Sequence, residues 1–386
     1  MKKSLLLLAF ISCSLLAFNQ TLTPTYSDLD YVGNGNTKQM LDLYIPSGVN
    51  SPTPLIIHIH GGAFMGGSKG IAEQGSFRTF YNAGYICADI NYRLSGDSIW
   101  PAQLFDCKTA VRFLKAHADL YHIDTCRIGL IGESAGGHLV SITGTTCNDP
   151  SVEGLHLGSA GVSSRVQAVV DLFGPTDFLQ MDGHEGIGCT SANHNAANSP
   201  ETILLGCALP TCPERVESAN PMHYLDSDDP QVFVSCGDHD CLVAPYSSLL
   251  FDAALSEKNV THTYELIAGQ GHGGSFWHST AQDAKYLEFF NAALADGCNT
   301  TDIKERDLKR SKISIFPNPA TSGFTLELPA DEYFDIQMKD LTGRNVYQQM
   351  QVTGSHHISI SDFPAGLYLI EAFGGKHLLN GKVMKN

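Results

Sequence analysis

The chain has 386 residues, 43% of them apolar and 17% charged, which is enough for a full-size globular core and a smaller second unit. This composition excludes a wholly disordered protein. Asp and Glu outnumber Lys and Arg by 40 to 24, so the formal net charge is -16. A strongly acidic protein is a poor partner for nucleic acids and for anionic membrane surfaces.

The N-terminus has the features of a secretory signal peptide, which we assign to residues 1–20. Lys2 and Lys3 precede a short apolar stretch that continues through Ile11, and polar residues return at Asn19. The stretch is too short to span a membrane, and no later stretch is long and apolar enough. We therefore expect an exported protein that is soluble after cleavage, with no integral membrane span.

Eleven cysteines, ten of them beyond the signal, are typical of an oxidising compartment. Two pairs are close in sequence, Cys207 with Cys212 and Cys236 with Cys241, and Cys189 lies in the same region. A zinc ribbon is the alternative interpretation, but these spacings differ from those of paired zinc knuckles. The sequence leaves the disulfide pairing open and predicts no metal site.

After the signal, apolar strand-like segments alternate with segments of helical length. Strands are expected at residues 39–46, 55–60, 85–90, 127–131, 166–173, 231–236 and 261–267, and helices at 72–82, 102–120, 137–141, 246–255 and 276–294. This alternation predicts an α/β fold with a mostly parallel sheet and helices on both faces. Residues 178–220 break the pattern, as an insertion at the rim of a binding site would.

Residues 132–136 read Gly-Glu-Ser-Ala-Gly and connect an apolar strand to a helix-like segment. A serine at the apex of such a sharp turn has an exposed hydroxyl, and the backbone N–H after it points at the group that the hydroxyl attacks. Residues 66–70 fit the same pattern, but no strand leads directly into them and no amphipathic helix follows, so we predict a flexible loop there. The context selects Ser134 as the nucleophile of an acyl-transfer reaction.

Glycines follow the predicted strand at residues 55–60 and indicate a close approach of the backbone to another group. Gly61 and Gly62 are placed to offer N–H groups to an oxyanion, although a tight strand-to-helix turn would use the same residues. His58 and His60 alternate on the strand and could form a metal pair. We interpret them as structural, because spacing supplies no third ligand.

A serine nucleophile needs an imidazole that accepts its proton, on a loop at the same rim of the sheet. His272 lies in a glycine-rich loop directly after a predicted strand and meets this condition. His262 begins a strand, and His278 lies in the following helix, so we expect structural roles for both.

The imidazole in turn needs a carboxylate that fixes its tautomer. Asp238 and Asp240 share one loop after a strand, and we choose Asp240 because the chain turns toward a helix directly after it. Asp177, which also follows a strand, is the fallback. The order Ser, Asp, His along the chain is that of the α/β-hydrolases.

Seven motifs support this assignment together. They are HGGAF at 60–64, NYRLS at 91–95, GESAGGHL at 132–139, FGPTDF at 173–178, SPETILLG at 199–206, GDHDCLV at 237–243 and GQGHGG at 269–274. With them, residues 55–294 of the unit that we place at residues 21–297 resemble α/β-hydrolase esterases of the acetylxylan and feruloyl esterase type, which are related to the hormone-sensitive lipases. The resemblance implies Asp240 as the acid, oxyanion donors at Gly61 or Gly62 and at Ala135, and no cofactor. It leaves the ester open.

The last part of the chain has a different pattern. Residues 298–312 are polar and mixed in charge, and we assign them to a linker. Residues 313–386 alternate short strands with turns, which predicts a small all-β sandwich; a carbohydrate-binding module would fit this pattern. However, FPNPATSGF, DLTGRNV, DFPAGLYLIEAF and the basic ending GKVMKN resemble the C-terminal sorting domain of type IX secretion cargo. The resemblance implies recognition by the type IX machinery, export to the cell surface or beyond, and removal of the tail.

The sequence therefore predicts a secreted serine carboxylesterase that acts on a small ester or an acylated polysaccharide, with acetyl or feruloyl esters of plant polysaccharide as the expected substrates. A peptidase of the prolyl-oligopeptidase kind would use the same triad, but the chain has no long propeller-forming N-terminal region. A non-catalytic carbohydrate-binding protein on a hydrolase scaffold is the other alternative. It is disfavoured because Ser134, Asp240, His272 and the oxyanion loop are all present.

Overall fold

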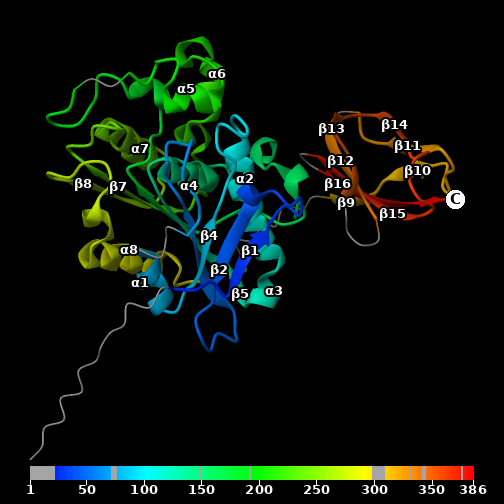
Figure 1. Cartoon of the computed structure of the whole chain (residues 1–386), viewed down its shortest axis with the longest axis horizontal. Coiled ribbons are helices and arrows are strands. Elements are labelled where there is room, and N and C mark those ends of the chain that lie inside the picture. The colour runs from blue at the N-terminus through cyan, green and yellow to red at the C-terminus, as the bar shows by residue number, and fades with distance from the viewer. Residues whose placement is uncertain are drawn as a thin grey trace, which may run out of the picture.

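The computed structural model describes residues 22–70, 76–147, 149–190, 193–297, 309–330, 333–340, 345–374 and 377–386. The predicted signal peptide and residues 298–308 of the predicted linker lie outside these ranges. The described chain forms an α/β unit and a C-terminal all-β unit (Figure 1). Within it, no helix combines the length and the apolar composition that crossing a bilayer requires.

An eight-stranded sheet forms the centre of the α/β unit, in the order β1-β2-β4-β3-β5-β6-β7-β8. Its strands are β1 (Tyr26–Asp30), β2 (Met40–Tyr44), β3 (Thr53–Ile59), β4 (Ile86–Ile90), β5 (Ile123–Glu133), β6 (Ala168–Leu172), β7 (Gln231–Gly237) and β8 (His262–Ile267). β2 pairs antiparallel with β1 and β4, and every other neighbouring pair is parallel. The predicted mostly parallel sheet is confirmed. β1, at the sheet edge, was not predicted from the sequence.

Helices cover both faces of this sheet, as predicted. The helices are α1 (Ser76–Asn82), α2 (Ala102–Ala116), α3 (Ala118–Tyr121), α4 (Ala135–Thr145), α7 (Pro245–Glu257) and α8 (Thr280–Ala293). α2, α4 and α7 pack on one face, and α1 and α8 lie together on the other (Figure 1). Side chains of the strands alternate between the two cores: Ile57 faces the first, Ile56 the second. The sheet is therefore buried on both sides.

Two predicted helices are shorter than expected. The segment 102–120 breaks at His117 into α2 and α3. The segment 276–294 begins with a separate 3-10 turn, η8 (Ser275–His278), because Ser279 starts α8 as its N-cap and accepts a hydrogen bond from the Gln282 N–H. This break leaves the chain after β8 free to form a loop at the rim of the sheet.

The insertion between β6 and β7 forms short helices instead of extending the sheet. They are η5 (Phe178–Gln180), α5 (Pro200–Leu205), η6 (Leu209–Thr211), α6 (Pro213–Ser218) and η7 (Pro221–Tyr224). A disulfide joins Cys207 to Cys212 within the insertion, and a second joins Cys189 to Cys241 on the loop after β7. Cys236, which is close to Cys241 in the sequence, is a buried free thiol.

The C-terminal unit has two sheets that share one core, in agreement with the predicted sandwich. One sheet contains β10 (Ser314–Phe316), β11 (Gly323–Glu327) and β14 (Ser355–Ser359); the other contains β13 (Asn345–Val352), β12 (Phe334–Lys339), β15 (Gly366–Gly374), β16 (His377–Lys385) and β9 (Lys309–Lys312). The structure corrects the end of the predicted linker: residues 309–312 form β9, which pairs in parallel with β16. Edge strands commonly carry charged residues, so the charged sequence of β9 was mistaken for a linker.

Candidate active site

Ser134 lies in the turn between β5 and α4, at the carboxyl end of the sheet. Its backbone has φ 55° and ψ -120°, a sparsely populated conformation for a residue with a side chain. The turn is fixed on both sides, because the Ser134 N–H donates to Leu172 O of β6 (2.9 Å) and the His138 N–H donates to Ser134 O (3.0 Å). The expected strand, sharp turn and helix are therefore present.

Glycines allow α4 to pass directly against β3. A Cβ added to Gly136 would lie 2.0 Å from Ile59 O, and one added to Gly132 would lie 2.5 Å from Gly136 O. Neither position has room for a side chain without moving backbone. The glycines on both sides of Ser134 thus let the strand, the turn and the helix come within contact distance.

The three predicted triad residues meet in space although they come from distant loops. His272 Nε2 lies 2.8 Å from Ser134 Oγ, and His272 Nδ1 lies 2.7 Å from Asp240 Oδ2. Asp240 is fully buried, and its other oxygen accepts the N–H groups of Leu242 (2.8 Å) and Val243 (2.9 Å). This is the arrangement of a nucleophile, a base and an acid that orients the base.

The two other candidate acids are engaged elsewhere. Asp238 Oδ1 accepts the Gly269 N–H (2.6 Å) and lies 2.6 Å from His239 Nδ1, so it joins the loops after β7 and β8. Asp177 accepts the Leu179 N–H (3.0 Å) at the start of η5. Their side chains therefore stabilise loops, and only Asp240 contacts His272.

The remaining candidate histidines have other partners. His262 Nε2 lies 3.0 Å from Asp252 Oδ1, and His278 Nδ1 lies 3.4 Å from Ser76 Oγ. His60 stacks on Tyr92, and its Nδ1 lies 2.7 Å from Gly61 O. Across the described ranges, no three His, Cys, Asp or Glu side chains gather as metal ligands would.

The loop after β3 runs over the nucleophile turn. A Cβ added to Gly61 would lie 2.7 Å from Glu133 O and 3.4 Å from Ser134 Cβ, so the backbone here is as close as glycine permits. Gly62 O accepts the N–H groups of two residues further along the loop, at 3.0 and 2.9 Å. Ala135 begins α4 directly after Ser134 and is buried. Gly61 and Ala135 therefore lie beside Ser134, and Gly62 follows Gly61 in the same loop.

The predicted flexible loop at residues 66–70 is a loop, but its backbone is anchored. The Lys69 N–H donates to Asn91 Oδ1 (2.7 Å), and the Gly70 N–H donates to Asp89 Oδ2 (2.6 Å). The Lys69 ammonium also contacts Asp42 (2.7 Å). Ser68 lies outside the catalytic constellation.

The insertion supports the acid loop, which sequence reasoning did not detect. The N–H groups of Gly186 and Ile187 donate to the carbonyl oxygens of Asp240 (3.0 Å) and Asp238 (2.7 Å), and the Cys189–Cys241 disulfide closes the same contact. A Cβ on Gly186 would lie 2.6 Å from the Asp240 backbone. Cys189 was the one available signal, but its spacing did not identify its partner.

Buried titratable groups lie beneath the turn. His138 Nδ1 on α4 donates to Pro175 O (2.8 Å), and the ring packs against the rings of Phe64 and Phe178. Burial lowers the pKa of His138 to about 4, so the ring is neutral. Burial also raises the pKa of Asp171 to about 6, although Ser141 and the Gly174 N–H donate to its carboxylate.

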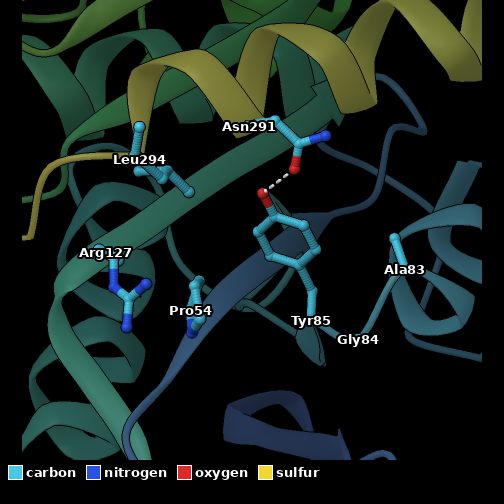
Figure 2. A pocket seen from close by; sticks show the side chains of 8 residues that line it. Pro54, Ala83, Gly84, Tyr85, Arg127, Asn291 and Leu294 are labelled. Carbon is cyan, nitrogen blue, oxygen red and sulfur yellow. Dashed lines mark hydrogen bonds between the residues drawn. The ribbon is translucent and has the colours of Figure 1, made fainter.

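A pocket of about 250 Å³ lies away from this rim, near the amino ends of β3 and β4 (Figure 2). Pro54, Tyr85, Arg127 and Leu294 are among its lining residues, and the Tyr85 hydroxyl donates to Asn291 Oδ1 at 2.8 Å. The triad lies at the carboxyl ends of the parallel strands, so this pocket is not part of the catalytic constellation.

Two family models and several known proteins are similar to this chain. The BD-FAE family model matches residues 41–255, and the secretion system C-terminal sorting domain matches residues 314–386. A truncated carbohydrate esterase from gut microbiota is 28% identical, with a TM-score of 0.65, over 72% of this chain and 98% of its own. A bifunctional GH43-CE protein of Bacteroides eggerthii is 31% identical, with a TM-score of 0.63, over 69% of this chain and 38% of its own.

Among curated proteins, the esterase LipC of Mycobacterium tuberculosis (strain ATCC 25618 / H37Rv) is 28% identical over 61% of this chain. The matched region is 57% of LipC, so the chain spans little more than half the length of that relative. These similarities support the α/β-hydrolase esterase fold and the sorting domain that the motifs predicted.

Proposed function

Because the chain belongs to the BD-FAE family, we propose that its α/β unit hydrolyses carboxylic esters with Ser134 as the nucleophile. The observation that carries the proposal is the hydrogen-bonded sequence from Ser134 through His272 to Asp240. A serine hydroxyl is a weak nucleophile at neutral pH unless a neighbouring base takes its proton. His272 is the group within reach of that proton.

In this mechanism His272 Nε2 accepts the proton as Ser134 Oγ attacks the ester carbonyl. Asp240 stabilises the charged imidazole and keeps Nδ1 protonated, and backbone N–H groups of Gly61 or Gly62 and of Ala135 donate to the oxyanion. His272 then returns the proton to the leaving alcohol. Water, activated by the same base, releases the acyl group and restores the serine.

We propose acetyl or feruloyl esters on plant polysaccharide as the substrate class. The carbohydrate esterase among the similar structures supports a carbohydrate ester, and the sorting domain supports an enzyme that meets its substrate outside the cell. Export would proceed through the type IX machinery, with the C-terminal unit as the address and no part in the chemistry. The enzyme would then be secreted or held at the cell surface.

The test compares wild type with Ser134→Ala on p-nitrophenyl esters from acetate to decanoate, methyl ferulate and acetylated xylan. Removing the nucleophile should lower kcat by roughly four orders of magnitude or more. Ser68→Ala is the matched control, because Ser68 occupies the second Gly-x-Ser-x-Gly pattern and should retain full activity. Equal activity of wild type and a folded Ser134→Ala variant would overturn the proposal.

A further inference from the structure

His58 on β3 lies between two carboxylates. Its Nδ1 is 2.8 Å from Asp89 Oδ1 on β4, and its Nε2 is 2.9 Å from Glu133 Oε2 at the end of β5. Asp89 is fully buried, and His58 is 6% exposed. None of these three residues belongs to the triad or the oxyanion loop.

The geometry favours a charged imidazole. A neutral imidazole has a single N–H, whereas an imidazolium donates from both ring nitrogens at once. Burial opposes the charge, but Glu133 and Asp89 outweigh it and hold the pKa of His58 well above its ordinary value. Burial likewise opposes ionisation of Glu133, and the nearby His58 outweighs it, so the pKa of Glu133 is lowered. The cluster therefore holds one positive and two negative side chains.

Strand register explains why these side chains meet. His58 is the partner of Asp89 in the β3–β4 pair and of Ile131 in the β3–β5 pair. Since alternate residues of a strand share a face, Glu133 lies on the same face as Ile131, one step nearer to the turn. The cluster is built into three adjacent parallel strands exactly where β5 ends.

Glu133 connects this cluster to the catalytic residues. Its peptide bond leads into Ser134, and its carbonyl oxygen is the atom against which Gly61 packs. Asp89 extends the cluster to the anchored loop, because its second oxygen accepts the Gly70 N–H (2.6 Å). The nucleophile turn and the oxyanion loop thus both contact Glu133, and His58 holds the Glu133 side chain.

We propose that His58 is a positioning residue of the esterase, whose imidazolium fixes the side chain of Glu133, the residue directly before the nucleophile, and neutralises its carboxylate. The inference rests on the proposed serine mechanism. An uncompensated carboxylate at this place would disfavour the negative charge that develops during attack, and water cannot screen it well in a buried site. Other titratable groups that interact with His58 or Glu133 are His60, His278, Tyr92 and Tyr286.

The experiment measures kcat and KM of His58→Gln, Glu133→Gln and the double variant on p-nitrophenyl acetate between pH 6 and 9. His58→Gln leaves two carboxylates without their cation, and kcat should fall about ten- to hundredfold with KM within about twofold. Its activity should fall further as rising pH ionises the half-buried Glu133. The double variant restores the net charge of the cluster, so its kcat should exceed that of His58→Gln at least about fivefold.

His262→Gln is the matched control, since His262 also contacts a carboxylate but lies on edge strand β8. It should retain wild-type kcat. If His58→Gln does not fold, the double variant decides: kcat within about tenfold of wild type supports the proposal, and a larger loss overturns it. Wild-type kcat in folded His58→Gln, or a double variant no better than that single variant, also overturns it. Activity in Ser134→Ala would instead remove the proposed function itself.

Discussion

The proposed catalytic triad has two halves, the nucleophile turn with Ser134 and the acid loop with Asp240, and different parts of the fold hold them in place. Ser134 is fixed by the strands around it. β6 accepts its N–H, α4 packs against β3 directly after it, and His58 contacts the side chain of Glu133 directly before it. Asp240 lies on a loop, and a segment of the insertion between β6 and β7 holds this loop through backbone hydrogen bonds and a disulfide. The two bonded cysteines are 52 residues apart along the chain. The nucleophile half is held by neighbouring strands of the sheet, and the acid half is held by a segment outside the sheet.

Their positions in the sheet reinforce this difference. β6, beside the nucleophile, is buried throughout, whereas β8, which leads to His272, is an edge strand with partly exposed side chains. Edge positions lose less apolar contact when they shift. The acid half should therefore be more sensitive to changes outside the sheet, and the nucleophile half to changes within it.

The largest effect on kcat is expected at the contact between Asp240 and His272. In Asp240→Asn, the N–H groups of Leu242 and Val243 would retain the amide oxygen, so the NH₂ group would face His272 Nδ1. This selects the tautomer with its proton on Nε2, which cannot accept the serine proton. We expect kcat on p-nitrophenyl acetate to fall by about three to four orders of magnitude, with little change in KM.

Asp177→Asn is the control for this variant. Asp177 follows a strand as Asp240 does, but its carboxylate caps η5, and asparagine caps helices equally well. Its kcat should stay within about threefold of wild type. A comparable loss in both variants would show that the acid assignment is wrong.

The two disulfides test the dependence of the acid half on the insertion. Cys189–Cys241 spans 52 residues and braces the acid loop, while Cys207–Cys212 spans 5 and lies within the insertion. From loop closure, the double serine variants should lose about 4 and about 2 kcal/mol of unfolding free energy. Only Cys189→Ser/Cys241→Ser should also lower kcat, by about tenfold, because it loosens the loop that positions His272.

Urea unfolding and kcat on p-nitrophenyl acetate, measured side by side, separate these effects. Equal kcat losses in both double variants would mean that the insertion acts as a whole on the site. An unchanged kcat in Cys189→Ser/Cys241→Ser would mean that the backbone bonds from Gly186 and Ile187 suffice to hold the acid loop.

The same contrast explains what could be predicted from the sequence. The central strands and the turn around Ser134 have sequence patterns that are local in the chain, so motifs and periodicity located them. β1 and β9 were missed, because edge strands with polar or charged residues lack the alternation of a buried strand. The interpretation of His58 as structural omitted its partners, which are 31 and 75 residues away.

The smallest predicted effect concerns how the free energy of unfolding depends on pH through His138, which lies on α4 directly after Ser134. His138 is buried and neutral with a pKa of about 4, whereas an unfolded histidine titrates near 6.5, so protons favour the unfolded chain. Stability from this group is present above about pH 6.5 and lost as pH falls toward 4, up to roughly 3 kcal/mol. His138→Phe removes the titration and the contact with Pro175, so the advantage of wild type over the variant in urea unfolding should shrink between pH 7 and 4.

His58 acts in the opposite direction, because its raised pKa stabilises the fold below pH 6.5 and that contribution is lost only as pH rises through the raised value. A difference between wild type and His138→Phe that does not change with pH would mean that α4 lets water reach the ring, and the nucleophile half would then be less tightly enclosed than its strands suggest.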